Sequence, residues 1–138
     1  MRKMGIEYPS RGQVSYVDLG NPPPPGPTEV LIETVYSGIT NGTERQALLG
    51  EHGWKGNFPS RHGYQQVGVV KAIGDSVRDF NVGDWVFYGR YVGHRGWNIQ
   101  DVSCADQRSY GSHLVMKLPD GISQNVCALF GVAGVAMR

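Results

Sequence analysis

Twenty glycines spread along this 138-residue chain constrain its fold more than any other feature. They recur at short intervals without a fixed repeat, and eight prolines add further interruptions. Both residue types weaken the interiors of long helices and favour turns, bulges and close approaches of the backbone. Together they make up about a fifth of the chain, which is below the level typical of disordered sequences. The sequence therefore predicts a mainly β fold made of short strands.

Several segments between these glycines and prolines have the β-branched residues, the aromatic residues or the alternation of strands. The expected strands cover residues 12–19, 29–36, 65–73, 85–88 and 110–118. The intervening segments are expected to be an extended proline-rich linker at 21–27, turns at 74–76, 81–84 and 119–121, and loops at 50–63 and 89–108.

Four residues in these segments have a local structural explanation. Gly68 stands inside an expected strand, where it lets another segment approach closely. Gly74 and Gly83 stand at expected hairpin ends, where a positive φ is often required. Asp84 can cap its own turn through its side chain.

Two helices are expected. Thr43 is a suitable N-cap for a short helix through about Leu49, with the acidic Glu44 in its first turn. A second helix is expected after Ser123, where apolar residues cover nearly every face and predict burial. The chain reaches Arg138 inside this apolar pattern. We therefore expect a boundary between domains here, and association or disorder of the isolated end.

The charge balance excludes several classes of partner. Thirteen Lys and Arg oppose twelve Asp and Glu, which gives a net charge of +1 with no basic run. Neither a nucleic acid nor a membrane is therefore expected as a partner. No apolar stretch approaches the roughly 18 residues of a membrane span, and residues 1–7 lack the apolar run of a secretory signal. Cys104 and Cys127 show no disulfide spacing, so we expect reduced thiols and a cytoplasmic protein.

A succession of motifs resembles the signature of the medium-chain dehydrogenases/reductases. Residues 63–70 (GYQQVGVV) resemble the G-H-E-x-x-G-x-V strand of that family. Residues 74–77 resemble its G-x-x-V turn, and residues 80–86 (FNVGDWV) resemble its V-G-D-x-V strand. Upstream, residues 38–44 (GITNGTE) resemble the G-I-C-x-[ST]-D motif with one residue inserted, and residues 118–136 resemble the lead-in to the cofactor domain.

The resemblance implies a GroES-like (chaperonin-10-like), partly open β-barrel for residues 1–122 and the start of a linker helix at residues 123–138. It also implies that a nicotinamide-binding Rossmann domain follows, because the chain has no G-x-G-x-x-G fingerprint. The implied cofactor is NAD or NADP, bound mainly by that absent domain, and the implied substrate is a small alcohol or carbonyl compound. The 138-residue fragment is then expected to be inactive alone, and the full-length protein to be a homodimer or higher oligomer.

Zinc-containing members of the family bind a catalytic zinc through a cysteine, a histidine and a second cysteine, with a glutamate nearby. The resemblance places Thr40 at the first cysteine, Tyr64 at the histidine, Gln65 at the glutamate and Val132 at the second cysteine. None of these is a good zinc ligand. The four closely spaced cysteines of the structural zinc lobe are absent as well, because residues 89–108 contain only Cys104. A zinc-lacking member without a metal is therefore expected.

The histidines leave this expectation unchanged. His62 stands one residue before Gly63, and a shifted register would make it a candidate ligand. Even so, Thr40, Gln65 and Val132 at the remaining positions supply no good zinc ligand. His94 and His113 stand alone in polar surroundings, where solvent or a backbone partner is usual.

Without a metal, other groups must stabilise the developing oxyanion or donate a proton. Tyr64 is the candidate donor, with a pocket-lining aromatic as the alternative. Thr43 is a candidate relay or only a helix cap. The candidate catalytic residues are Thr40, Thr43, Glu44, Tyr64 and Gln65, the candidate cofactor contacts are Thr43 and Val132, and the candidate pocket aromatics are Trp54, Phe58, Tyr88, Tyr91 and Trp97.

Three functions remain open at this point. The first is the substrate-side domain of a zinc-independent, NAD(P)-dependent alcohol dehydrogenase or carbonyl reductase. The second is an enoyl or quinone reductase on the same scaffold, which would reduce an activated C=C bond. The third is a non-catalytic, chaperonin-10-like binding module. A co-chaperonin needs a mobile loop with an apolar tip, and the segment at 50–63 is too polar for that.

Overall fold

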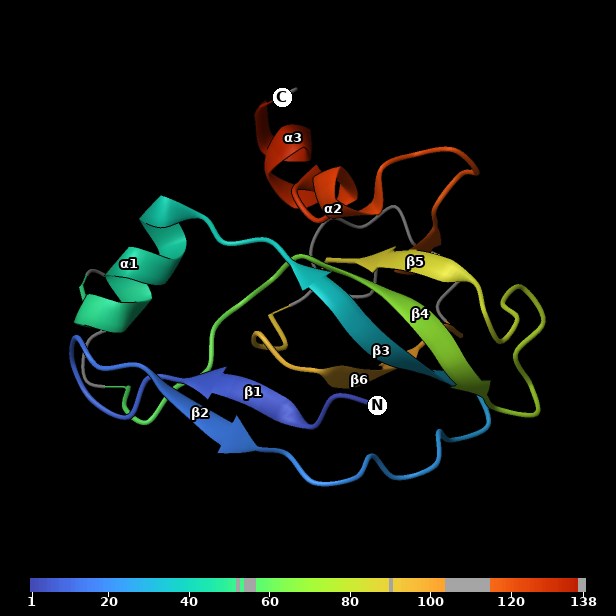
Figure 1. Ribbon diagram of the computed structural model, residues 1–138, viewed down its shortest axis with the longest axis horizontal. Helices are drawn as coiled ribbons and strands as arrows, with labels where there is room; N and C mark the ends of the chain where they lie inside the picture. Colours follow the sequence, from blue (N-terminus) through green and yellow to red (C-terminus); the bar gives the residue numbers. More distant parts are fainter. Residues whose placement is uncertain (52, 54–56, 90, 104–114, 137–138) are drawn as a thin grey trace.

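The computed structural model describes residues 1–51, 53, 57–89, 91–103 and 115–136. Within these ranges the chain forms short strands and a few short helices (Figure 1). The strands are β1 (Met4–Glu7), β2 (Ser15–Asp18), β3 (Glu29–Ser37), β4 (Gln66–Ile73), β5 (Trp85–Tyr88), β6 (Trp97–Asp101) and β7 (Val115–Lys117). The helices are α1 (Asn41–Leu49), α2 (Gln124–Cys127) and α3 (Phe130–Ala136). The mainly β fold is confirmed.

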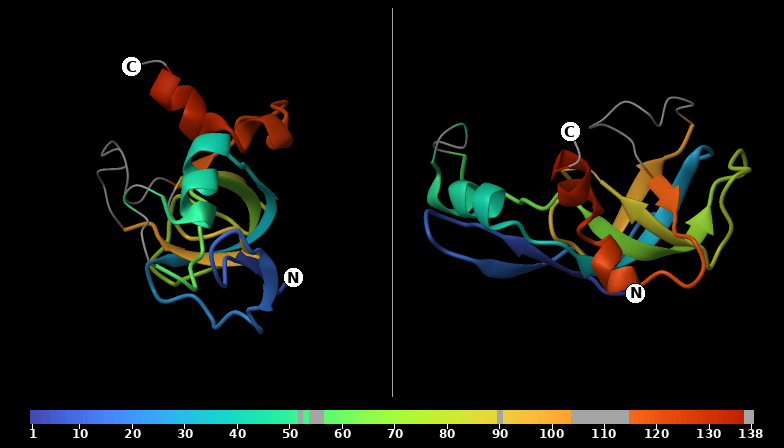
Figure 2. Two further views of the ribbon diagram at one scale, coloured as in Figure 1. Left: turned by 90° about the vertical axis from the view of Figure 1, so that its left-hand side faces the viewer. Right: turned by 90° about the horizontal axis from the view of Figure 1, so that it is seen from above.

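The strands form one curled antiparallel sheet and a separate hairpin. The sheet has the order β6-β3-β4-β5-β7, and β1 pairs with β2 in the hairpin and forms one bridge, Gly5 to Arg95, with the segment before β6. The β3–β4 register shifts between Leu31 and Ile32 and again between Thr34 and Tyr36. Such bulges bend and twist a strand pair, and the sheet curls as Figure 2 shows. The result is the expected GroES-like, partly open barrel, with α1 at one end and α2 and α3 above the sheet (Figure 1).

The main core lies against the three inner strands of the sheet. Val30 and Ile32 of β3, Val70 of β4, and Val86 and Tyr88 of β5 are all fully buried in one cluster. Four of these are β-branched residues, which pack well on a pleated surface. Burial of each contributes about 1.5–3 kcal/mol, so this cluster holds the strands that end at the candidate site.

A second cluster forms where α2 meets the sheet. Val67 of β4 and Phe87 of β5 pack against Cys127 and Ala128, and the ring of Phe130 lies 5.9 Å from that of Phe87. Cys127 is a free, fully buried thiol, and burial raises its pKa. The cluster fixes the C-terminal helices over the end of the sheet.

The strands at 29–36, 65–73 and 85–88 match β3, β4 and β5 to within a residue, whereas β2 covers only the second half of segment 12–19. Two strands were missed. β1 lies in the N-terminal segment, and β6 lies inside the expected loop at 89–108. β7 forms the described end of segment 110–118, of which residues 110–114 lie outside the described residues.

Both helices differ from expectation. The N-cap of the first is Thr40, three residues before Thr43, and Thr43 lies inside the first turn of α1. Ser123 occupies the N-cap position as expected, although its side chain makes no capping hydrogen bond, and the segment divides into α2 and α3 around Ala128. Val126 is 58% exposed and Leu129 47%, so this segment buries one face and is not buried all round.

The structural glycines and Asp84 mostly behave as expected. A Cβ at Gly68 would lie 2.3 Å from the Glu33 carbonyl oxygen, which confirms the close approach. Gly83 has a φ of 98°, and Asp84 accepts the Asn81 N–H at 2.8 Å. Gly74 has no positive φ; a Cβ there would lie 2.0 Å from the Gly26 carbonyl oxygen, so close packing explains this glycine.

No helix in the described part of the chain is long and apolar enough to cross a membrane.

Candidate functional site

Two loops that carry the sequence motifs meet at one end of the sheet. The first, Gly38–Thr40, connects β3 to α1, and the second, Gly63–Gln65, leads into β4. The Gly38 N–H donates to the Gln65 carbonyl oxygen at 3.0 Å, which extends the β3–β4 pairing into the loops. The strand pair therefore delivers Thr40 and Tyr64 to the same place.

Thr40, Glu44 and Tyr64 form one hydrogen-bonded group. The Tyr64 hydroxyl donates to Thr40 Oγ1 at 3.1 Å, and Thr40 Oγ1 donates to Glu44 Oε2. Glu44 Oε2 also accepts the Thr40 N–H at 3.1 Å. The Glu44 side chain thus reaches back to the start of its own helix, which satisfies an otherwise unpaired donor there. The hydroxyls of Tyr64 and Thr40 form a path that ends on a carboxylate.

Gln65 and the start of α3 form the neighbouring group. Gln65 is fully buried, and its Oε1 accepts the Val132 N–H at 3.2 Å. A Cβ at Gly131 would lie 2.9 Å from Gln65 Oε1 and 3.6 Å from Cε2 of the Tyr64 ring. The four positions that the resemblance assigned to zinc binding are therefore close together, as two hydrogen-bonded pairs.

His94 adds a group that the sequence did not indicate. Its ring is buried, Nδ1 lies 2.5 Å from Ser37 Oγ, and Nε2 lies 3.7 Å from Glu44 Oε1. Glu44 is likewise buried, with 5% of its surface exposed. Ser37 is the last residue of β3, and His94 lies in the loop before β6. His94 therefore connects the end of β3 with Glu44 of α1. The expectation of a solvent or backbone partner for His94 was wrong.

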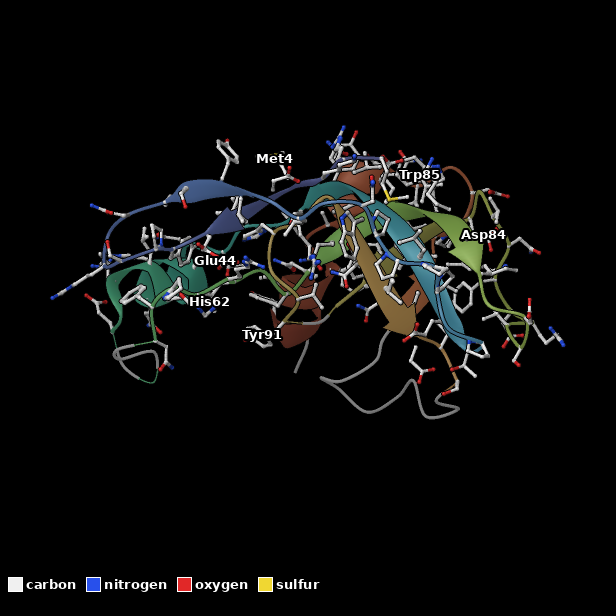
Figure 3. The ribbon with its side chains drawn as sticks, turned by 90° about the horizontal axis from the view of Figure 1, so that it is seen from below. Met4, Glu44, His62, Asp84, Trp85 and Tyr91 are labelled. Atoms are coloured by element: carbon white, nitrogen blue, oxygen red, sulfur yellow. The ribbon has the colours of Figure 1, made fainter. Side chains whose placement is uncertain are left out.

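The carboxylate of Glu44 influences several titratable groups around it. Burial lowers the pKa of His94, although Glu44 opposes this effect and His62 adds to it. Burial also lowers the pKa of His62, again against the effect of Glu44. The pKa of Tyr91 is raised by burial, then by Tyr64 and Glu44. Figure 3 shows Glu44, His62 and Tyr91 at the α1 end of the molecule, far from Asp84.

His62 itself is a buried aromatic residue. Its ring stacks on Tyr8 with a centroid distance of 5.6 Å and an interplanar angle of 16°. Its carbonyl oxygen accepts the His94 N–H at 2.9 Å, which fixes the two histidine loops together. Its ring therefore helps to pack the N-terminal segment against the site.

The candidate pocket aromatics separate into different environments. Tyr91 is 62% exposed and tilts against Tyr64 at 5.3 Å, so it does belong to the site. Phe58 is half-buried in the loop before Ser60. Trp97 donates its indole N–H to the Gly20 carbonyl oxygen, which places it beside the N-terminal segment.

Tyr88 is a correction. It is fully buried in the main core, where its hydroxyl lies 2.6 Å from Thr34 Oγ1, so it lines no pocket. Burial, its largest influence, raises the pKa of its phenol. Trp54 lies outside the described residues, as does His113.

The donor set does not fit zinc. Thr40 and Tyr64 offer neutral hydroxyls, Gln65 offers an amide and Val132 offers no donor side chain. Across the described ranges, no group of three or more His, Cys, Asp or Glu residues is arranged to hold a metal ion.

The cofactor positions fit one part of a nicotinamide nucleotide. Val132 has an exposed apolar side chain at the start of α3, and Thr43 lies half-buried in the first turn of α1. Beside Val132, Gln65 Nε2 is buried without a hydrogen-bond partner among the described residues. Apolar and uncharged polar groups suit the nicotinamide ring, whereas phosphates need a different set of donors.

A cavity of about 380 Å³ lies between the N-terminal hairpin and the second half of β3. Its lining includes Ile6, Tyr16, Val35, Ser37 and His94. The Ser37–His94 pair therefore borders both this cavity and the group around Glu44.

Ser37 and His94 are functional candidates that sequence reasoning missed. His94 is separated from Glu44 by fifty positions, and only the fold brings them together. A usable signal was the run Val92-Gly93-His94, because a histidine beside a positive-φ glycine (Gly93, φ 84°) is held in a defined turn.

Comparison with known proteins agrees with this geometry. A family model described as the alcohol dehydrogenase GroES-like domain matches residues 26–136. A zinc-type alcohol dehydrogenase-like protein of Schizosaccharomyces pombe is 33% identical over 128 residues, covering 88% of this chain and 36% of that protein. A quinone oxidoreductase of Pseudomonas syringae pv. Tomato superposes with a TM-score of 0.70 at 27% identity, over 99% of this chain and 39% of that one. An Escherichia coli quinone oxidoreductase, solved with NADPH, gives 0.71 at 22% identity, over 96% and 38%.

The chain thus spans less than two fifths of the length of these proteins. The part that it spans is the curled antiparallel sheet with α1 at one end and the C-terminal helices over it (Figure 1). The family model covers most of that sheet together with the loops of Thr40 and Tyr64. The chain therefore belongs to the alcohol dehydrogenase GroES-like domain family, within the medium-chain dehydrogenases/reductases.

Proposed function

We propose that this chain is the substrate-side domain of a zinc-independent, NAD(P)-dependent oxidoreductase that interconverts small alcohols and carbonyl compounds. The observation that carries the proposal is the hydrogen bond that the Tyr64 hydroxyl donates to Thr40. The Thr40 hydroxyl in turn donates to the Glu44 carboxylate. A phenol held in this way can supply or take a proton at the substrate oxygen. The Tyr64 phenol would then take the role that the catalytic zinc ion has in zinc-containing members of the family.

The residues divide the chemistry between them. The Tyr64 oxygen accepts a hydrogen bond from the substrate hydroxyl, while its own proton points to Thr40, which orients the phenol. Glu44 holds Thr40 through both its hydroxyl and its N–H, so the pair is preorganised. Gln65 fixes the start of α3 through the Val132 N–H. Tyr91 covers the ring of Tyr64 and provides an apolar wall for the substrate.

A nicotinamide, when bound, supplies or accepts the hydride. Thr43 and Val132 are the residues of this chain that would contact it, and a Rossmann domain beyond residues 123–138 would hold the rest. Residues 1–122 would then be the GroES-like domain, and the fragment alone would be inactive. The whole protein would be a cytoplasmic homodimer or higher oligomer that acts on a small molecule.

Quinone or enoyl reduction is the second candidate. It is favoured by the 27% identity to the quinone oxidoreductase of Pseudomonas syringae, which covers nearly the whole chain. The same phenol can protonate a carbanion or an enolate oxygen after hydride addition. Tyr64 and Tyr91 would also stack with a planar ring.

The test uses the complete natural reading frame that contains this chain. NADH and NADPH are titrated by fluorescence, bound metal is measured on the same sample, and turnover is assayed with benzaldehyde and with 1,4-benzoquinone. Micromolar nicotinamide binding, less than about 0.1 zinc per chain and turnover of benzaldehyde support the proposal. Turnover of the quinone alone selects the second candidate.

Stoichiometric zinc would show that the metal-free reading of Thr40 and Tyr64 is wrong. Absence of nicotinamide binding would leave a partner-binding module as the better explanation. A Gln65→Glu variant is a useful companion, because it restores the family's acidic residue at that position without adding the missing zinc ligands. Its metal content should stay as low as that of the wild type.

A further inference from the structure

We propose that His94 relays protons between the Tyr64–Thr40–Glu44 group and the cavity under the N-terminal hairpin. The inference rests on the proposed function and deepens it. It assigns a role to a residue that touches no reacting atom and acts through Glu44.

A chain of neighbouring polar groups leads from the substrate side to the cavity. Tyr64 donates to Thr40, Thr40 donates to Glu44 Oε2, and Glu44 Oε1 faces His94 Nε2 at 3.7 Å. His94 Nδ1 lies 2.5 Å from Ser37 Oγ. Only the Glu44–His94 separation exceeds hydrogen-bonding distance, by a few tenths of an ångström, and such contacts tighten when substrate binds.

The two facing atoms at that separation are both unsatisfied. Glu44 Oε1 and His94 Nε2 are buried and have no hydrogen-bond partner among the described residues. Both side chains are more than nine-tenths buried. A buried acceptor and a buried ring nitrogen that face each other are costly unless a proton is shared between them. An apolar side chain would fill the space at position 44 or 94 without this cost.

The far end of the path reaches an open volume. Ser37 and His94 both line the cavity of about 380 Å³, whose other walls include the apolar side chains of Ile6 and Val35. A cavity of this size has room for water, and Ser37 is one of its lining residues. The path therefore connects the buried carboxylate with exchangeable protons.

The proton balance is complete in both directions. In alcohol oxidation, the substrate O–H bond breaks as a new Tyr64 O–H bond forms. The Tyr64 proton passes to Thr40, and the Thr40 proton passes to the Glu44 carboxylate. A bound NAD(P)⁺ would take up the hydride, with its two electrons, from the substrate carbon, which would leave a carbonyl group.

Glu44 then passes its proton to Nε2 of His94, and the Nδ1 proton leaves through Ser37 to water in the cavity. Each step breaks one O–H or N–H bond and forms another, so Glu44 and His94 return to their starting charge. His94 is left with its proton on Nε2, and the cycle closes when the ring turns about its Cβ–Cγ bond and exchanges that proton for one on Nδ1. Carbonyl reduction with NAD(P)H follows the same path in reverse.

The groups around His94 favour this exchange. Glu44 is the facing anion, and His62 and Tyr8 are the neighbouring titratable groups on the N-terminal side. Tyr91 lies on the substrate side with Tyr64. Burial lowers the pKa of His94 and so keeps a free ring nitrogen available near neutral pH.

The first test compares His94→Asn with His62→Asn in the full reading frame, assayed with benzaldehyde and NADPH at low buffer concentration. His62 is the matched control, because it is also a buried histidine near Glu44 but stacks on Tyr8. His94→Asn should lower kcat at least tenfold, within the range for general acid–base groups, with nicotinamide Kd unchanged. Added imidazole should restore kcat several-fold, because it can enter the cavity beside position 94.

Imidazole should have no effect on His62→Asn. A His94→Asn kcat within about twofold of wild type overturns the relay, and so does a loss that imidazole does not relieve, because both indicate a structural role. If His94→Asn does not fold, Ser37→Ala decides instead: it should lower kcat and increase the solvent isotope effect, and unchanged values overturn the relay.

A second test requires no turnover. The titration of His94 is followed by NMR in the wild type and in Glu44→Gln. Loss of the facing carboxylate should lower the pKa of His94, and identical titration curves would break the central link of the relay. If the wild type shows no nicotinamide-dependent turnover while His94 still responds to Glu44→Gln, the proposed function fails and the catalytic relay fails with it, but the coupled pair stands.

Discussion

Gly38 lies so close to Ala128 that a Cβ at position 38 would be 2.2 Å from the Ala128 carbonyl oxygen. The loop that carries Thr40 is therefore packed directly against the C-terminal helices. The same added atom would lie 3.1 Å from Cγ of Gln65. Gly38 thus lets three motif segments, distant in the sequence, meet at the candidate site.

The first prediction concerns this contact. Gly38→Ala should lower the free energy of unfolding by about 1–3 kcal/mol, because backbone atoms must move to accept the methyl group. Gly42→Ala is the control: Gly42 lies in α1 with nothing within 4 Å of an added Cβ. It should stabilise by about 0.5–1 kcal/mol through helix propensity. Urea unfolding measures both, and equal effects at the two positions would contradict the close packing.

The central strands could be predicted because their burial follows their sequence pattern, but β6 could not. Its inward-facing residues are polar: Asn98 and Gln100 are buried, and the Gln100 amide donates to Asn98 Oδ1 at 2.8 Å. Such a strand inverts the usual alternation, and only its pairing with β3 reveals it. Local patterns predict a strand when apolar residues face inward, and they fail when the buried residues are polar.

The candidate site was predictable to the extent that it depends on motifs. Thr40 and Tyr64 stand at matched motif positions, and the structure joins them directly. The helix start was placed three residues late because the Glu44 side chain, reaching back to Thr40, replaces the usual cap at Thr43. The run Val92-Gly93-His94 indicates a turn, but it does not show that Ser37 of β3 and Glu44 of α1 are the partners of His94.

The second prediction concerns the buried hydrogen bond between Tyr88 and Thr34 in the main core. Tyr88 and Thr34 share a buried hydrogen bond of 2.6 Å, so Tyr88→Phe should cost about 1–3 kcal/mol by leaving the Thr34 hydroxyl unpaired. Thr34→Val should cost a similar amount. The double variant should cost clearly less than the sum of the two, because neither polar group then remains. A double-mutant cycle by urea unfolding gives the coupling energy, and strict additivity would argue against the pair.

The third prediction concerns pH. The pKa values of His62 and His94 are lowered, mainly by burial, so between these values and about 6.5 the unfolded chain binds more protons than the folded one. The free energy of unfolding should therefore be unaffected by these two histidines above about pH 6.5, and it should decrease as the pH falls below that value. Urea unfolding at pH 7.5 and 5.5 should show this loss, and His62→Asn should lose less than wild type over the same interval. An equal loss in both proteins would remove His62 from the explanation.

The last prediction concerns the phenol at the centre of the proposed chemistry. Tyr64→Phe removes the hydroxyl that donates to Thr40 at 3.1 Å and keeps the ring that packs against Tyr91. In the full-length protein kcat should fall by about 10²-fold, since a proton donor is lost, while nicotinamide affinity and the unfolding midpoint should hardly change. Tyr91→Phe is the matched control, because it removes a phenol from the same aromatic pair without touching Thr40, and its kcat should stay within about threefold of wild type. Equal losses in the two variants would indicate that the pair acts by packing, and the proton-donor role of Tyr64 would then be abandoned.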